Sequence, residues 1–462
     1  MLFSSPLFLF LFQPFSVLTY FAFSFAWRNL ILLGLSILFY SWGEPRFVFV
    51  LLAMAALDWW LAERIARHDA VACWWLSFGV TANLSLLFFF KYADFALHVL
   101  QPLVGTLPHL ALTLPIGISF FVFEKITYLV DIYRGTGKAA AKFTDYLLFV
   151  FFFPKMLAGP IIKYHEIESA LRARTSSWDD RTAGFLRFLW GLARKVLIAD
   201  TCGELVDEAF ALPHGGMGFS TAWLALLAFT TQIYFDFAGY SDMAIGLARI
   251  FGFRLRENFD NPYGAASFTE FWRRWHISLT SWIREYLYVP LGGNRDGTAR
   301  TYANLWICFL LSGLWHGAAW NFVLWGAWNG LFLVADRVFL LKVSARFPRF
   351  ISVGVTLFLV MLGWGLFRSR SLAQLQELFT ALFSPGLTGQ FVRIPEDQLA
   401  AIVIGLVGAL VAATGPMKII ATRTADSRVA RAAVACVVCL LGSLAVAKAV
   451  TVTFNPFLYF QF

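Results

Sequence analysis

The chain of 462 residues is 59% hydrophobic and only 14% charged, with 51 Phe and 18 Trp. A soluble globular protein could not bury that much apolar surface, so the composition indicates a polytopic membrane protein. The net charge of +9 comes from Lys and Arg in short segments between apolar runs, which is typical of anchors at a membrane surface. No separate basic tail or domain is present, and we do not expect nucleic acid as a partner.

The apolar runs predict an all-α chain with about ten to twelve membrane segments, because each span needs about 20 apolar residues. The N-terminal run lacks a basic region and a small-residue cleavage site, so we expect it to be kept as the first span. Lys and Arg in the first loops favour an external N-terminus. The runs lie near residues 6–25, 29–57, 72–97, 111–133, 143–162, 184–205, 220–252, 302–339, 350–367, 399–421 and 431–453.

Some segments are unsuited to simple spans. Pro154 and Gly159-Pro160 interrupt one apolar run, so residues 150–163 are predicted to enter the membrane and return. Asp179 to Asp200 is amphipathic and predicts an interfacial helix. Residues 254–300 mix aromatic and charged side chains, which predicts a re-entrant or interfacial pair of short helices. We expect residues 1–462 to form a single integral-membrane domain.

The run 302–339 is too long for one span and carries His316 in its middle, far from the flanking charges of Arg300 and Asp336. Helix rise places the imidazole about 20 Å from the polar edge, roughly mid-depth in a hydrocarbon core about 30 Å thick. An ionisable group at that depth is read by default as part of a site or pathway.

The plausible partner of His316 is His276, in the charged segment 254–300. Each histidine follows a tryptophan, Trp275 and Trp315, and these would form an apolar wall suited to an acyl thioester. A neutral imidazole in such a site can accept a proton from an attacking hydroxyl. The alternative for each histidine is a hydrogen-bonded structural role.

Two carboxylates, Asp236 and Asp242, lie in an apolar run before the charged segment. They are six positions apart, so on a regular helix they do not share a face, and Gly239 is a candidate break between them. Asp242 could orient a histidine or bind a cation. Equally, it could neutralise a buried arginine such as Arg249 or Arg273.

Other motifs carry less information. Asn258 and the Gly292-Gly293 pair are typical turn residues around the charged segment. Cys436 and Cys439 form a C-x-x-C, but it has no second pair and no nearby histidine, so no metal site is predicted. No serine-hydrolase, metalloprotease or nucleotide-binding pattern is present.

Taken together, several strings resemble the membrane-bound O-acyltransferase (MBOAT) family, and within it the bacterial branch that O-acetylates alginate. The strings are FSS at 3–5, YFDFAGYSDMAIG at 234–246, FWRRWHISL at 271–279, LGGNR at 291–295, GLWHGA at 313–318, WGAWNG at 325–330 and PFLYFQF at 456–462. Glu285 departs from the pattern, since relatives have Asp after the arginine.

The resemblance implies the MBOAT fold, with His316 as the catalytic residue and His276 as the second active-site histidine. His316 would deprotonate an acceptor hydroxyl or assist a covalent acyl step, while His276 would position or polarise the thioester. No bound cofactor or metal is expected, and acetyl-CoA is the expected acyl donor. The side chains that we expect to line the acyl site are Trp275, Trp315, Tyr240 and Asp242.

The resemblance further implies a bacterial inner-membrane enzyme that passes an acetyl group from a cytoplasmic thioester to a periplasmic acceptor, for O-acetylation of an exported polysaccharide, most simply alginate. The expected partners are a periplasmic acetyltransferase protein and membrane lipid. Acetylation of cellulose or another glycan, and D-alanyl transfer to teichoic acid, stay open as alternatives. A non-enzymatic transporter of an acyl donor or glycan would require continuous charged pathways and a pseudo-repeat, which the sequence lacks.

Overall fold

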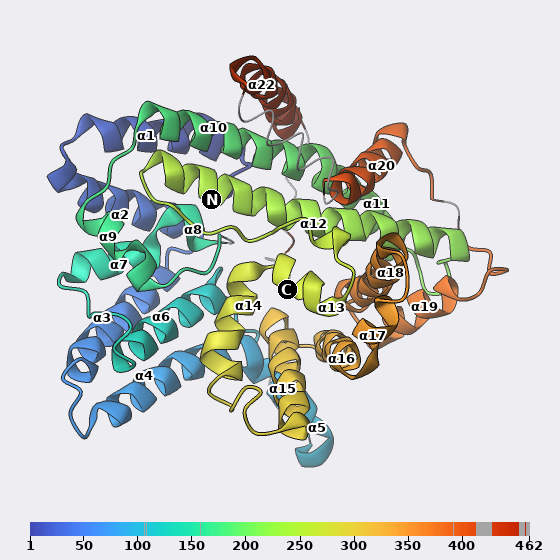
Figure 1. Ribbon diagram of the computed structural model, residues 1–462, viewed down its shortest axis with the longest axis horizontal. Helices are drawn as coiled ribbons and strands as arrows, with labels where there is room; N and C mark the ends of the chain where they lie inside the picture. The colour runs from blue at the N-terminus through green and yellow to red at the C-terminus, as the bar shows by residue number, and fades with distance from the viewer. Residues whose placement is uncertain are drawn as a thin grey trace. The chain divides into compact units, whose positions relative to one another are not determined.

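In the computed structural model every regular element is a helix, within the part of the chain that it describes, residues 1–105, 107, 109–157, 159–390, 392–412, 427–451 and 458 (Figure 1). This confirms the all-α prediction. The predicted spans 399–421 and 431–453 are only partly within the described residues. The C-terminal string at 456–462 lies outside them except for Leu458.

The chain folds as two compact units, each built from two stretches of sequence. The first unit holds Met1–Phe188 and Tyr240–Arg256, and the second holds Leu189–Gly239 and Glu257–Phe462. The expectation of a single domain over residues 1–462 stays a prediction.

The first unit contains the N-terminal helices and one end of α10 and of α12. Its helices are α1 (Gln13–Ala22), α2 (Phe25–Ser41), α3 (Phe47–Ile65), α4 (Ala72–Leu87), α5 (Ala93–Val104), α6 (Ile118–Tyr133), α7 (Phe143–Phe151), α8 (Phe153–Met156), α9 (Tyr164–Arg172) and the first part of α10 (Trp178–Ala193). The interrupted run is observed here, because α7 stops at Phe151 and Pro154 lies in the first turn of the short α8. Lys155 of α8 forms a buried ion pair with Glu124 of α6, which fixes the broken segment.

The second unit contains the remaining helices. They are α11 (Asp200–Phe210), the first part of α12 (Phe219–Ile250), α13 (Phe268–Arg274), α14 (Ile277–Ile283), α15 (Thr298–His316), α16 (Trp320–Ala335), α17 (Leu341–Ser344), α18 (Arg349–Arg368), α19 (Leu372–Leu382), α20 (Glu396–Val411) and α22 (Arg428–Thr451). Residues 254–300 contain two short helices, α13 and α14, as expected, and their re-entrant or interfacial position stays a prediction. The helix predicted over 179–200 is also present, as α10 and a π-helical turn at Arg194–Ala199.

Four helical stretches are long and apolar enough to cross a membrane by length and composition, among the residues described. They are Ala72–Val104, Trp320–Ser344, Arg349–Arg368 and Arg428–Thr451. These stretches overlap the predicted runs at 72–97, 302–339, 350–367 and 431–453. The total of about ten to twelve segments stays a prediction.

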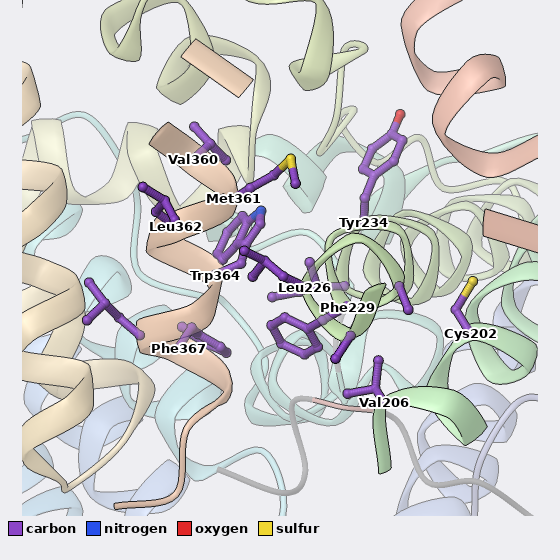
Figure 2. Close-up of a cluster of buried hydrophobic side chains, with 14 of the residues drawn as sticks. Cys202, Val206, Leu226, Phe229, Tyr234, Val360, Met361, Leu362, Trp364 and Phe367 are labelled. Carbon is purple, nitrogen blue, oxygen red and sulfur yellow. The ribbon is translucent and has the colours of Figure 1, made fainter. Parts of the chain in front are cut away.

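Part of the core of the second unit is formed where α18 packs against α12. Figure 2 shows Trp364 and Phe367 of α18 directed toward Leu226 and Phe229 of α12. Trp364, Phe367 and Phe229 are each at most 2% exposed. Burial of side chains this large stabilises the unit and leaves the C-terminal half of α18 at a fixed position.

Candidate active site

Helix α15 ends at His316, so this histidine occupies a helix terminus instead of the middle of a continuous helix. The long apolar run folds as a hairpin, because Gly317 (φ −161°, ψ 149°) and Ala319 adopt extended backbone between α15 and α16. A Cβ atom on Gly313 would lie 2.2 Å from the backbone oxygen of Phe322, so the two helix backbones approach as closely as only glycine permits. The turn places the His316 side chain against α16, where it is 6% exposed.

His276 lies between α13 and α14 in a left-handed backbone conformation, with φ 44° and ψ 55°. Residues other than glycine rarely adopt this backbone conformation, and backbone strain of this kind is concentrated at functional sites. The imidazole is 1% exposed and packs edge-on against the ring of Phe237, 4.6 Å away between ring centroids. Burial lowers the pKa of His276 to about 3, so the ring is neutral at pH 7.

The two predicted histidines lie in one cluster of the second unit, joined by the indole of Trp315. The ring centroid of Trp315 is 4.9 Å from that of His316 and 6.3 Å from that of His276. We call these three residues the histidine cluster. Forty positions of sequence separate the two histidines, and only the packing of α13 and α14 against α15 and α16 brings them together.

Aromatic rings of α16 and α18 pack against His316 in the histidine cluster. His316 contacts Trp325 at 5.0 Å and Phe367 at 5.3 Å between ring centroids. Trp275 packs at 4.8 Å from Trp364. Such an apolar wall strengthens any electrostatic interaction inside it and suits the binding of an acyl group.

Polar contacts from neighbouring helices hold this aromatic wall in place. The Trp272 Nε1–H donates to Asn329 Oδ1 at 3.2 Å, which joins α13 to α16. The Asn321 side chain donates to the Ser369 backbone oxygen at 2.8 Å, which joins α16 to the end of α18. Both asparagines are 4% exposed, so these hydrogen bonds satisfy polar groups that would otherwise be buried at a cost.

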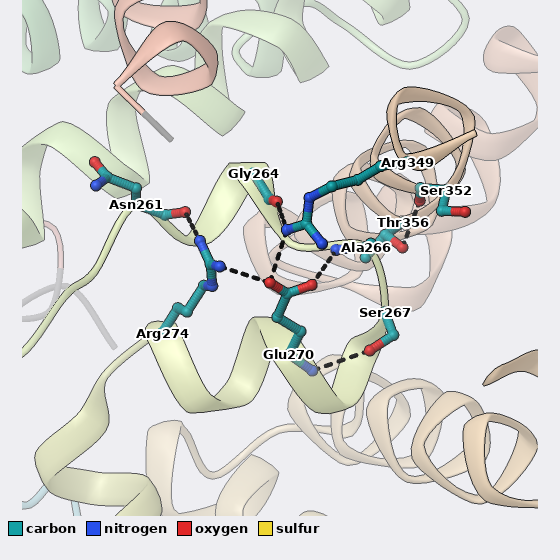
Figure 3. A network of polar contacts seen from close by, with 9 residues as sticks. All are labelled: Asn261, Gly264, Ala266, Ser267, Glu270, Arg274, Arg349, Ser352 and Thr356. Atoms are coloured by element: carbon teal, nitrogen blue, oxygen red, sulfur yellow. Dashed lines mark hydrogen bonds and ion pairs between the residues drawn. The ribbon is translucent and has the colours of Figure 1, made fainter. Parts of the chain in front are cut away.

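Glu270 anchors α13 to the beginning of α18 (Figure 3). Ser267 caps α13 by accepting from the Glu270 N–H at 3.1 Å. The Glu270 carboxylate binds Arg274 at 2.5 Å and Arg349 at 2.8 Å, and accepts from the Ala266 N–H at 2.7 Å. Burial alone would raise the pKa of the Glu270 carboxyl, but the Ala266 hydrogen bond and the two arginines outweigh burial and lower this pKa below its ordinary value.

Tyr240 and Asp242 belong to the first unit and have their own contacts there. Tyr240 stacks on Phe3 with 4.7 Å between ring centroids. The Asp242 carboxylate accepts from Arg187 at 2.9 and 3.1 Å. The suggested arginine partners Arg249 and Arg273 were therefore wrong, since the arginine comes from α10. The placing of Tyr240 and Asp242 in the acyl site stays a prediction.

Asp236 and Gly239 correct a second detail of the same helix. Gly239 does not break α12, which is continuous over Phe219–Ile250. A Cβ atom on Gly239 would lie 2.7 Å from the Gly191 oxygen, so this glycine serves close packing against α10. Asp236 pairs with Lys195 at 2.8 Å, and both side chains are 3% exposed.

Sequence reasoning missed several residues of the site. Asn258 was interpreted as a turn residue, yet its Oδ1 lies 3.2 Å from Nδ1 of His276. Phe237, Trp364 and Phe367 contact the site from α12 and α18. Their positions follow no local spacing rule relative to the histidines, so the sequence held no signal for their contacts.

No three His, Cys, Asp or Glu side chains are placed together to hold a metal ion, as far as the described residues extend. The five cysteines are free, and Cys436 and Cys439 are exposed on α22.

Comparison with known proteins places this chain in a family. A model of the membrane-bound O-acyltransferase family matches residues 69–373, which include the histidine cluster. The chain is 39% identical to the probable alginate O-acetylase AlgI of Azotobacter vinelandii, with the whole of both chains aligned. It is 41% identical to the probable alginate O-acetylase AlgI of Pseudomonas aeruginosa, over 88% of this chain and 79% of that protein.

A relative named for a different acceptor is also similar. The chain is 34% identical to the peptidoglycan O-acetyltransferase of Helicobacter pylori, over 84% of this chain and 80% of that protein. Relatives named for alginate and for peptidoglycan thus share most of this sequence. The protein belongs to the membrane-bound O-acyltransferase family and is a membrane acyltransferase.

Proposed function

We propose that this enzyme transfers an acetyl group from acetyl-CoA on the cytoplasmic side of the bacterial inner membrane to a hydroxyl acceptor on the periplasmic side. The end product would be an O-acetylated exported polysaccharide, and alginate is the polymer that we propose. The similarity to two alginate O-acetylases, at 39% and 41% identity, supports this choice of polymer. The proximate acceptor would be a hydroxyl of a periplasmic acetyltransferase partner.

The observation that carries the proposal is the histidine cluster itself. His276 and His316 are both buried, and both rings approach the indole of Trp315. In the proposed step, the acceptor oxygen attacks the thioester carbonyl carbon while His316 removes the hydroxyl proton. The carbon–sulfur bond then breaks, and the proton passes from His316 to the departing thiolate.

His276 would position the reacting groups beside His316. Holding two reactants in an attack geometry can supply about 7–11 kcal/mol of the barrier. Aromatic side chains that exclude water from the site would also protect the thioester from hydrolysis. The glycan acceptor differs among relatives, as the peptidoglycan enzyme illustrates, so the polymer is the part of the proposal that most needs a direct test.

The test is the acetyl content of secreted polymer from a strain that carries only a variant gene. His316→Ala is expected to abolish acetylation while membrane insertion stays intact. His98→Ala is the matched control, because His98 is exposed on α5 and should keep full acetylation. Acetylated polymer from the His316→Ala strain would refute the proposed role of His316. Acetate on a polymer other than alginate would refute the proposed polymer.

A further inference from the structure

We propose that Asn258 is a positioning residue that holds His276 in a single tautomer, so that His276 offers a lone pair at Nε2. The inference rests on the proposed function in one respect only, namely that His276 faces the reactants. The tautomer itself follows from hydrogen bonds of the second unit. Asn258 is 1% exposed and its side chain lies against the residues that begin α14.

The orientation of the Asn258 amide is settled by a backbone group. The oxygen and nitrogen of an asparagine amide have nearly the same shape, so hydrogen-bond partners must decide between them. The atom assigned as Oδ1 lies 3.2 Å from the backbone nitrogen of Ser278, and a backbone N–H can only donate. This atom must therefore be the oxygen. The Ser278 hydroxyl, 2.9 Å away, donates to the same atom.

The same oxygen decides the state of the imidazole. Nδ1 of His276 lies 3.2 Å from Asn258 Oδ1, which has no hydrogen to give. Nδ1 must then carry the hydrogen and donate it. Because a neutral imidazole holds a single N–H, the lone pair is on Nε2.

The backbone keeps Asn258 and His276 in this arrangement before any substrate binds. The Ile277 N–H donates to the Asn258 backbone oxygen at 3.0 Å, and the Asp260 N–H donates to the Arg274 oxygen at 2.9 Å. These two bonds bracket His276 on both sides. His276 has a left-handed backbone conformation, and its ring lies beside Asn258. The two backbone hydrogen bonds help to maintain this strained conformation.

The consequence is a restriction on what His276 can do. A neutral ring with its lone pair at Nε2 cannot donate to a thioester carbonyl oxygen, so it does not polarise that group. It can only accept a hydrogen bond from an O–H or N–H group of a substrate. We therefore assign His276 the role of holding such a donor group beside His316.

The first experiment reads the tautomer directly, without any activity. Protein with ¹⁵N-labelled histidine rings is purified in detergent, and the signals of His276 are assigned by their loss in His276→Asn. We expect a protonated Nδ1 and an unprotonated Nε2 in the wild type at pH 7. A protonated Nε2 would overturn the inference, whatever the acetylation assay shows.

The second experiment compares two substitutions that differ in hydrogen-bonding capacity. Asn258→Leu removes the acceptor at similar volume, and we expect kcat to fall about 10- to 100-fold with little change in KM. Asn258→Asp keeps an accepting oxygen, so it should restore turnover. Its carboxylate also stabilises the imidazolium, so the acidic limb of the pH–rate profile should move to higher pH.

The controls separate this inference from the proposed function. Gln101→Leu changes an exposed amide side chain on α5, outside the strings that resemble the family, and should leave both spectrum and turnover unchanged. Equal turnover in Asn258→Leu and wild type would overturn the positioning role of Asn258. Full acetylation by His276→Asn would refute the proposed function while the measured tautomer still stood.

Discussion

Gly313 provides a sharp test of the backbone contact that positions His316. A Cβ atom at Gly313 would lie 2.2 Å from the Phe322 oxygen and 3.2 Å from the Gly326 Cα, whereas ordinary contact begins near 3.4 Å. Because these are backbone atoms, Gly313→Ala must push α15 and α16 apart by about 1 Å. Overpacking of this kind costs about 1–3 kcal/mol of stability. A displacement of about 1 Å at a catalytic group can lower the rate about 100-fold.

The matched control is Gly354→Ala on α18, in the same unit. No atom lies within 4 Å of a Cβ at Gly354, so the substitution should stabilise the helix by about 0.5–1 kcal/mol. Thermal unfolding in detergent and acetyl transfer by the purified protein measure the two effects. Wild-type unfolding midpoint and wild-type transfer in Gly313→Ala would show that the hairpin does not depend on this close approach.

Two further predictions concern buried charge. Glu270→Gln should destabilise the second unit at neutral pH. Because the pKa of Glu270 in the folded protein is below 4.5, the stability difference between wild type and variant should shrink as the pH falls below that value. A constant difference in stability from pH 7 to pH 3 would contradict the lowered pKa of Glu270. Lys195 also pairs with Asp200 at 2.5 Å, so Lys195→Met removes this countercharge from both the Asp236 and the Asp200 carboxylates and should lower stability by about 3–5 kcal/mol. The double variant Lys195→Met/Asp236→Asn should recover part of that loss in thermal unfolding, and no recovery would argue against the pair.

The sequence was informative about features that depend on residue type and local hydrophobicity. An ionisable ring in an apolar run is costly, and this singled out His276 and His316, which the structure brings together at Trp315. The predicted place of Trp275 in the acyl site stays a prediction. The all-helical class and the short helices α13 and α14 followed from hydrophobicity and mixed charge. These are local properties, and local properties can be read from one chain.

Contacts that depend on tertiary packing were harder to predict. Gly317 gave only a weak sign that the long apolar run would fold back, since glycine is also common inside membrane helices. The pairing of Asp242 with Arg187 could not be chosen from several nearby arginines. Asn258 is 18 residues before His276, and no periodicity of a helix or strand relates the two.

The glycine contact between α15 and α16 also affects how freely the sequence can change. His316 is located by main-chain atoms of a hairpin, whereas Ile307 and Leu311 point outward from the same helix and are 39% and 45% exposed. Replacement of such outward residues alters what the helix presents to its surroundings without moving the imidazole. Homologues in membranes of different lipid content can therefore diverge along this surface while their acyl chemistry is conserved.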